Sequence, residues 1–146
     1  IDVKSSNNNA NQSYQEAMKI KEILKTLLSS GFNHSRIGVI APFRAQVAEI
    51  RRNIELELIE YFDDHNSIKN MVDTVDRFQG DERDVILFSL TIGDSEIPKL
   101  LQDKRRLNVA ISRAKMKFIA IGDWHKALQS DTLSNLKKYY DSLGDK

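Results

Sequence analysis

The stretch Ile37-Gly38-Val39-Ile40-Ala41 is apolar at every position, and Pro42 follows it directly. A strand with one wet face alternates apolar and polar residues, whereas a strand that is covered on both faces reads as a continuous apolar run. Proline restricts the backbone of the residue before it and has no N–H to donate, so Pro42 marks the exit of this strand. The pattern predicts a central strand of a parallel sheet.

Helical periodicities alternate with further apolar runs along the chain. One helix is expected after cap candidates at 11–13 and ends near Gly31, and a second follows Pro42, with apolar residues at intervals of three and four in both. The other strand candidates are residues 1–3, 71–75, 85–92 and 118–121, and an amphipathic stretch closes the chain. This alternation is typical of βαβ units. We therefore predict an α/β fold, a three-layer domain with a mainly parallel sheet of about five or six strands flanked by helices.

Length and composition restrict the class of protein. The chain has 146 residues, which predicts one domain, and it begins with Ile1 rather than Met, so we expect a piece of a longer protein. Hydrophobic residues make up 40%, charged residues 29%, and the net charge of +1 does not by itself indicate a nucleic-acid partner. The lack of cysteine excludes a disulfide framework and a thiolate zinc site. No apolar run approaches the roughly 18 residues that span a bilayer, and no signal-peptide pattern opens the chain, so we expect no membrane association. The expected location is cytoplasmic or otherwise intracellular, and nuclear if the source is eukaryotic.

Polar clusters follow three of the predicted strands, at residues 42–46, 74–79 and 93–106. Parallel strands bring their carboxyl ends to the same edge of a sheet, and doubly wound folds bind ligands there. A polar loop after a strand is also an ordinary outcome. The placement therefore favours a ligand-binding face at this edge only moderately.

Two segments carry a family resemblance. Residues 75–86 read VDRFQGDERDVI and resemble motif V of superfamily 1 helicases, and residues 105–115 read RRLNVAISRAK and resemble motif VI. The residues of these two motifs are most similar to the Upf-type and Dna-type 1B branch. Residues 42–46 resemble motif IV of that branch, with Ala41 and Phe43 in place of its usual Thr and Tyr. The resemblance extends from Ser13 to Asp123. It implies that residues 1–146 form the second RecA-like domain of a helicase.

Motif VI places two arginines seven residues apart on one predicted helix, Arg106 and Arg113. Planar guanidinium groups suit phosphate oxygens, although for an arbitrary helix a solvated basic face is the more common outcome. The resemblance implies that Arg113 is the catalytic arginine finger that reaches the γ-phosphate of ATP, and that Arg106 belongs to the nucleotide site. Arginine fingers raise phosphoryl-transfer rates by roughly 10³ to 10⁵.

Motif V implies the remaining contacts. Glu82 matches the acidic residue that bonds the nucleotide ribose, with Gln79 and Gly80 in the same turn. The alternative for Glu82 is a turn residue in a charged cluster, and we favour the ribose contact. Thr74 and Asp76 occupy the positions at which motif V contacts single-stranded nucleic acid. Pro42 and Phe43 offer an aromatic face beside a base. The alternative for Thr74 is an ordinary β-branched residue of a β-strand.

The sequence contains no Gly-x-x-x-x-Gly-Lys-Ser/Thr loop, nor an Asp-Glu pair after an apolar strand. The resemblance implies that ATP and Mg²⁺ are held mainly by the N-terminal RecA-like lobe of the same parent chain, and that the polymer partner is single-stranded DNA or RNA. No significant ATP hydrolysis is expected from residues 1–146 alone.

Two other classes stay open. The first is a catalytically silent nucleic-acid-binding or regulatory module that keeps a helicase-like fold. The second, which we favour least, is a metal-dependent nuclease built on the acidic residues Asp73, Asp76, Asp81, Glu82 and Asp84.

Overall fold

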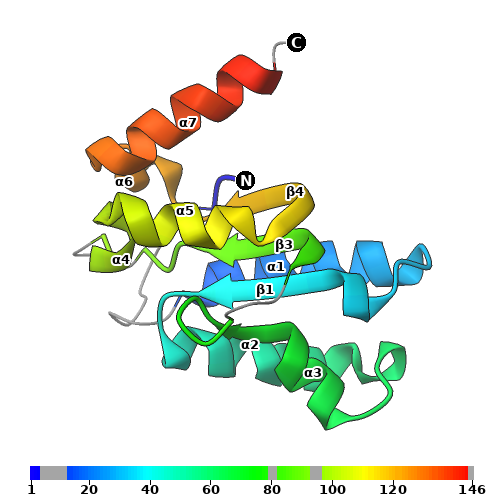
Figure 1. The fold of residues 1–146 in the computed structure, drawn as a ribbon. Helices are drawn as coiled ribbons and strands as arrows, with labels where there is room; N and C mark the ends of the chain where they lie inside the picture. The colour runs from blue at the N-terminus through cyan, green and yellow to red at the C-terminus, as the bar shows by residue number, and fades with distance from the viewer. Residues whose placement is uncertain (4–12, 79–81, 93–96, 145–146) are drawn as a thin grey trace.

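The computed structural model describes residues 1–3, 13–78, 82–92 and 97–144. Four strands form one parallel sheet in the order β2-β1-β3-β4 (Figure 1). Their bounds are β1 Ile37–Ala41, β2 Val72–Thr74, β3 Arg83–Ser89 and β4 Ala114–Ile121. The run that predicted a central parallel strand is β1, which pairs with β2 on one side and β3 on the other, so this prediction is confirmed.

Helices cover the sheet on both faces. The elements before β2 are α1 Tyr14–Ser29, η1 His34–Arg36, α2 Arg44–Glu57, η2 Ile59–Tyr61 and α3 His65–Met71. After β3 come α4 Lys99–Gln102, α5 Lys104–Ser112, α6 Trp124–Ala127 and α7 Asp131–Gly144. One apolar cluster joins α1, α2 and α3 to the sheet, and a second joins α4, α5 and the start of α7 to the opposite face (Figure 1). The three-layer α/β prediction is confirmed, and the fold is that of a RecA-like domain.

Local chemistry explains where the main helices begin and end. Ser13 caps α1, because its side-chain oxygen accepts from the Glu16 N–H at 3.3 Å. The chain leaves α1 through Gly31, which has a φ of 96° and so occupies a region that side chains disfavour. Asp103 caps α5 by accepting from the N–H groups of Arg105 and Arg106 at 3.1 and 3.3 Å. Asp103 thus sets the start of α5 at Lys104.

Three details of the predicted sheet are wrong. Residues 1–3 form only one bridge, Asp2 to Gly122, so the described part of the chain has four strands rather than about five or six. Strand β3 ends at Ser89 instead of 92, because Thr91 has a φ of 56° and leaves the extended region. Strand β4 begins at Ala114 instead of 118, and residues 115–117, which precede the predicted start, are exposed.

Gly38 lets the motif V segment cross the sheet closely. A Cβ atom at this position would lie 2.7 Å from both Ile86 Cδ1 and Phe78 Cζ, and 3.2 Å from Arg83 Cγ. Phe78 is buried, and the Arg83 guanidinium lies 5.3 Å from the centre of its ring. The absence of a side chain at position 38 thus fixes where the connection between β2 and β3 packs.

Gly38→Ala is expected to lower the free energy of unfolding by about 1–3 kcal/mol, because the added methyl group must displace Phe78 or Ile86 in a packed core. Thermal and chemical denaturation of the chain measure the loss. Gly31→Asn is the matched control: a Cβ there meets nothing within 4 Å, and Asn tolerates a positive φ. An equal or smaller loss for Gly38→Ala than for the control would contradict this account of Gly38.

Candidate functional site

The carboxyl ends of β1 and β2 bring two of the predicted segments together. Thr74 ends β2 and pairs with Ala41, the last residue of β1, and the Val75 N–H donates to the Ala41 carbonyl at 3.1 Å. Pro42 and Phe43 follow Ala41 directly, and Phe43 is the N-cap residue of α2. The structure therefore places Thr74 and Pro42–Phe43 at one edge of the sheet, as their sequence positions predicted.

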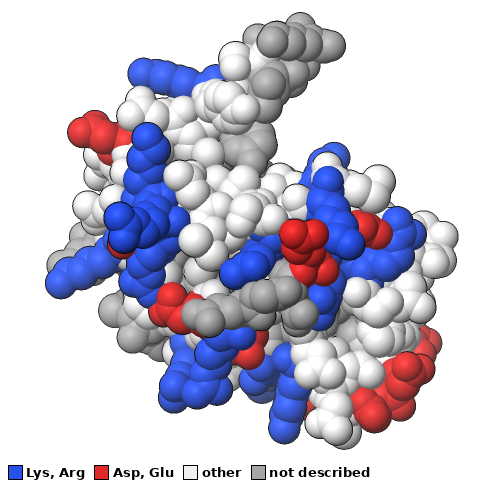
Figure 2. All heavy atoms as spheres, in the orientation of Figure 1, with Lys and Arg blue, Asp and Glu red and all other residues white. Residues whose placement is uncertain are grey.

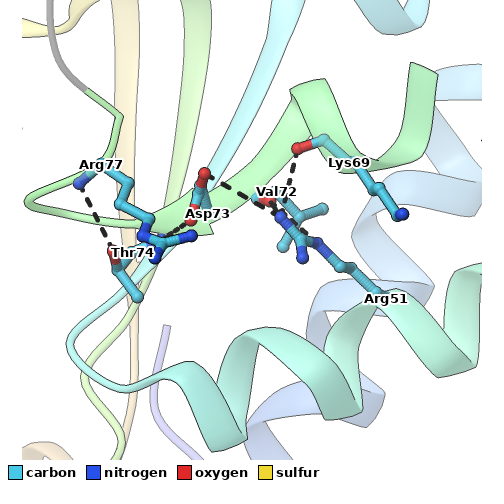
Figure 3. A network of polar contacts seen from close by, with 6 residues as sticks. All are labelled: Arg51, Lys69, Val72, Asp73, Thr74 and Arg77. Atoms are coloured by element: carbon cyan, nitrogen blue, oxygen red, sulfur yellow. Dashed lines mark hydrogen bonds and ion pairs between the residues drawn. The ribbon is translucent and has the colours of Figure 1, made fainter. Parts of the chain in front are cut away.

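The Thr74 side chain holds the turn that follows β2. It is 9% exposed, and its Oγ1 accepts from the Arg77 N–H at 3.4 Å (Figure 3). The Thr74 carbonyl also accepts from the N–H groups of Arg77 and Phe78, at 3.2 and 2.9 Å. A hydroxyl that accepts one bond still has a proton to donate. Thr74 is thus part of the turn, and its hydroxyl keeps a proton that it can donate.

Arg51 ties the same edge to helix α2, a role that the sequence did not reveal. Its guanidinium donates to the Val72 carbonyl at 2.6 and 3.1 Å and to the Lys69 carbonyl at 3.3 Å, and it lies 3.9 Å from the Asp73 carboxylate (Figure 3). Asp73 in turn accepts from the Thr74 N–H at 2.8 Å. This network fixes the backbone on which Thr74 stands. Only the tertiary fold brings position 51 to β2, so no local pattern could predict it.

Arg106 and Asp76 form an ion pair that joins the turn after β2 to the first turn of α5. Their side chains are 43% and 65% exposed, and pairs of this kind contribute little to stability in water. The contact shows that the start of α5 lies beside the turn that carries Asp76.

Arg113 and Glu82 lie at the opposite edge of the sheet. Arg113 is the C-cap residue of α5, and its carbonyl accepts from the Arg83 N–H at 2.9 Å, next to the exposed Glu82. Seven residues separate Arg113 from Arg106, which is about 10 Å along a helix axis. Among the described residues, no carboxylate pairs with the Arg113 guanidinium. Gln79 and Gly80 lie outside the described residues.

Basic side chains on the face that carries α5 form several groups with acidic side chains between them, rather than one continuous patch (Figure 2). This dispersion agrees with the net charge of +1. A broad basic surface is therefore not what this face offers to a polyanion. A nucleic-acid strand on this face would therefore be contacted by individual turns and helix starts.

A buried carboxylate lies behind the edge that carries Thr74 and Pro42. Glu16 is 1% exposed, and it accepts from the Ser89 hydroxyl at 2.7 Å and from the N–H groups of Thr91 and Ile92 at 2.7 and 3.0 Å. Its position three residues after Ser13 fits a capping box, which would have pointed to a local role. The structure directs the carboxylate to the end of β3 instead.

Gln46 extends this polar group to helix α2. It is fully buried, accepts from the Ser13 N–H at 2.8 Å, and donates to the Ser13 carbonyl at 3.0 Å and to the Ser89 Oγ at 3.1 Å. Ser89 therefore lies between Gln46 and Glu16 and bonds to both. The buried polar cluster of Ser13, Glu16, Gln46, Ser89 and Thr91 joins the starts of two helices to the end of a central strand.

Burial raises the pKa of Glu16 from its ordinary 4.5 to about 7, and the hydrogen bonds from Thr91, Ser89 and Ile92 oppose that shift. The folded chain thus binds a proton more tightly than the unfolded chain does between these two values. The contribution of Glu16 to the free energy of unfolding is therefore fully present below its pKa in the unfolded chain. It is lost as the pH rises through its pKa in the folded chain.

We expect Glu16 to contribute a fall of roughly 3 kcal/mol in the free energy of unfolding as the pH rises from about 4.5 to about 7. Chemical denaturation across this range, for the wild type and for Glu16→Gln, isolates the contribution because other titrating groups are common to both. The variant should show a smaller fall with pH. Parallel curves for the two proteins would mean that the Glu16 pKa is not raised.

The acidic residues of the nuclease alternative are not gathered into a metal site within the described residues, which contain no cluster of three or more His, Asp or Glu side chains suited to a metal ion. Asp73 lies near Arg51, Asp76 pairs with Arg106, and Asp84 accepts from the Arg36 Nε at 2.5 Å. Asp81 lies outside the described residues. Separately, none of the described helices is both long and apolar enough to cross a membrane.

Comparison with known proteins gives one consistent family. A family model described as an AAA domain matches residues 1–125. The chain is 33% identical over 140 residues to the "DNA replication ATP-dependent helicase/nuclease dna2" of Schizosaccharomyces pombe, covering 94% of this chain and 9% of that protein. It is 37% identical to the "Uncharacterized ATP-dependent helicase MJ0104" of Methanocaldococcus jannaschii, over 88% of this chain and 17% of that protein. It is also 37% identical to "Helicase sen1" of S. pombe, over 78% of this chain and 6% of that protein. The chain thus spans only a small part of these relatives.

Proposed function

Because the chain belongs to the Upf-type and Dna-type branch of superfamily 1 helicases, we propose that residues 1–146 form the second RecA-like lobe of an ATP-dependent helicase. The observation that carries this proposal is the course of α5. The helix has Arg106 beside the turn after β2 at one end and Arg113 beside Glu82 at the other. One short rigid element thus connects the proposed strand side with the proposed nucleotide side.

Arg113 is the proposed catalytic residue. ATP with Mg²⁺, held mainly by the N-terminal lobe of the parent chain, supplies the transferred phosphoryl group. The Arg113 guanidinium has no carboxylate partner among the described residues, so it fits the charge of phosphate oxygens without first breaking an ion pair. The exposed Glu82 carboxylate fits the ribose hydroxyls, because a carboxylate accepts hydrogen bonds from hydroxyl groups. Gln79 and Gly80 complete the proposed nucleotide side, whereas Arg106, which the resemblance also assigned there, pairs with Asp76 at the other end of α5.

Thr74, Asp76, Pro42 and Phe43 form the proposed strand side. The Thr74 hydroxyl retains a proton that it can donate to a phosphate oxygen of single-stranded DNA or RNA. The half-buried Phe43 ring follows Pro42 at the same edge and suits a base face. Contacts of this kind hold a strand without reading its sequence. The catalytically silent module is the alternative, and turnover of the parent protein decides between the two.

Replacing Arg113 in the parent protein tests the finger. Arg113→Lys and Arg113→Ala should both lower the ATP turnover number, by roughly 10³-fold or more, because one ammonium cannot reproduce the planar fork of the guanidinium. Melting temperature and nucleotide-free strand affinity should stay close to the wild type, since the side chain makes no ion pair within the described fold. Arg105→Ala, on the exposed side of α5, is the control for loss of one positive charge.

Near-normal turnover in Arg113→Lys would reduce Arg113 to a general positive charge. A collapse of the melting temperature in both Arg113 variants would make the residue structural. A wild-type parent protein that binds a single strand and never hydrolyses ATP would favour the silent module.

Thr74→Ala in the parent protein should weaken single-strand binding by about 1 kcal/mol, which is roughly fivefold in affinity, through loss of one hydrogen bond. The loss should be the same for strands of different base sequence. Fluorescence anisotropy at several salt concentrations measures it, and Thr74→Ser keeps the hydroxyl as a control. Equal affinity of the wild type and Thr74→Ala at every salt concentration would leave Thr74 as a turn residue only.

A further inference from the structure

The buried polar cluster joins three chain segments that meet at the edge of the sheet where Thr74 lies. Ser13 and Glu16 belong to the start of α1, Gln46 to the first turn of α2, and Ser89 and Thr91 to the end of β3. All five residues are buried, each at most 1% exposed, side by side with the apolar core. Polar groups taken out of water are retained at little cost only when each has a partner, and this cluster provides those partners internally.

Thr91 shows what the Glu16 carboxylate holds in place. The φ of 56° at Thr91 is unusual for a β-branched residue and persists only where the surroundings impose it. Glu16 accepts from the backbone N–H of Thr91 and from the next N–H, Ile92, with one oxygen for each. The carboxylate therefore fixes the direction in which the chain leaves β3. Residues 93–96 lie outside the described part of the chain, and after them come α4 and then α5, which carries Arg106 and Arg113. Ile92 packs in the same apolar cluster as Leu101 of α4 and Leu107 of α5.

Gln46 shows what the other side of the cluster holds. It lies in the first turn of α2, and the Val47 N–H donates to the Phe43 carbonyl at 3.1 Å. The Gln46 amide reaches back to both backbone groups of Ser13 and forward to Ser89. A movement of Phe43 that shifted the start of α2 would therefore strain the hydrogen bond between Gln46 and Ser89. Because Ser89 also donates to Glu16, the same movement would displace the Glu16 carboxylate.

We propose that Glu16 is a positioning residue that couples strand binding at Pro42–Phe43 to the arginine-bearing helix α5, by holding the start of α2 and the exit of β3 in one buried cluster. This coupling rests on the function proposed above, because it has meaning only if a strand binds at Phe43 and Arg113 acts on ATP. Glu16 itself touches neither ligand.

A carboxylate is required here for a chemical reason. Glu16 receives three donors, from Ser89, Thr91 and Ile92, and only an acceptor with two oxygens satisfies all of them. Gln has nearly the same shape, yet its NH₂ group would face an N–H donor and leave it without an acceptor. Glu16→Gln therefore releases one of these bonds while the volume of the core is preserved.

The test measures ATP turnover of the full parent protein with and without a saturating single strand of mixed sequence. For Glu16→Gln we expect the strand-stimulated turnover number to fall roughly tenfold, with strand-free turnover and the KM for ATP within about twofold of the wild type. Ser89→Ala should act in the same direction, because it removes the hydroxyl that connects Gln46 to Glu16 and leaves the bonds from Thr91 and Ile92 intact.

Ser130→Ala is the matched control. Ser130 is also a buried serine whose hydroxyl accepts from a backbone N–H, that of Leu133 at 3.5 Å, but it lies at the start of α7, away from the cluster. Its removal should leave the ratio of stimulated to strand-free turnover unchanged. A similar fall in that ratio for Ser130→Ala would show that any loosening of the core has this effect, and would overturn the proposal.

The outcomes separate the coupling from the function on which it rests. A wild-type protein without strand-stimulated turnover overturns the proposed function. A stimulated wild type whose ratio is preserved in both Glu16→Gln and Ser89→Ala overturns the coupling alone. If Glu16→Gln melts below the assay temperature, Ser89→Ala decides by the same ratio. Equal losses of stimulated and strand-free turnover would make the cluster merely structural and likewise overturn the coupling.

Discussion

The central strands β1 and β3 are buried on both faces, and the rest of the structure depends on that burial. Side chains of each strand alternate between two apolar clusters: Ile37, Val39 and Ala41 face α1 and α2, whereas Ile40 faces the side of α5. Neither face of these strands leaves room for exposed polar groups. Ligand chemistry is therefore restricted to strand ends and to the helices that cross from one edge to the other.

This restriction explains why the proposed functional residues divide between two edges. The turn after β2 and the start of α2 meet at the carboxyl ends of the strands, where Arg51 and the Arg106–Asp76 pair hold them. Arg113 and Glu82 stand at the amino ends of β3 and β4. Helix α5 spans the distance between these two edges.

The polar cluster around Glu16 lies within this buried region. Each of its five residues hydrogen-bonds to another member, and these bonds join α1, α2 and β3 where the three elements meet. Gly38 has the complementary role on the other face, since the missing side chain admits Phe78 of motif V. The cluster around Glu16 and the missing side chain at Gly38 thus position segments that are far apart in the sequence.

The sequence by itself determined the fold class, the central strand at 37–41, the main helices and the family, because each depends on local periodicity or on short contiguous motifs. It also placed Thr74 and Pro42 at one edge, since parallel strands share that edge. The tertiary structure alone decided that Glu16 reaches Thr91, that Arg51 reaches Val72, and that Arg106 pairs with Asp76. These contacts join residues that are distant in the chain, and no local pattern encodes which distant groups will satisfy a buried or partly buried charge.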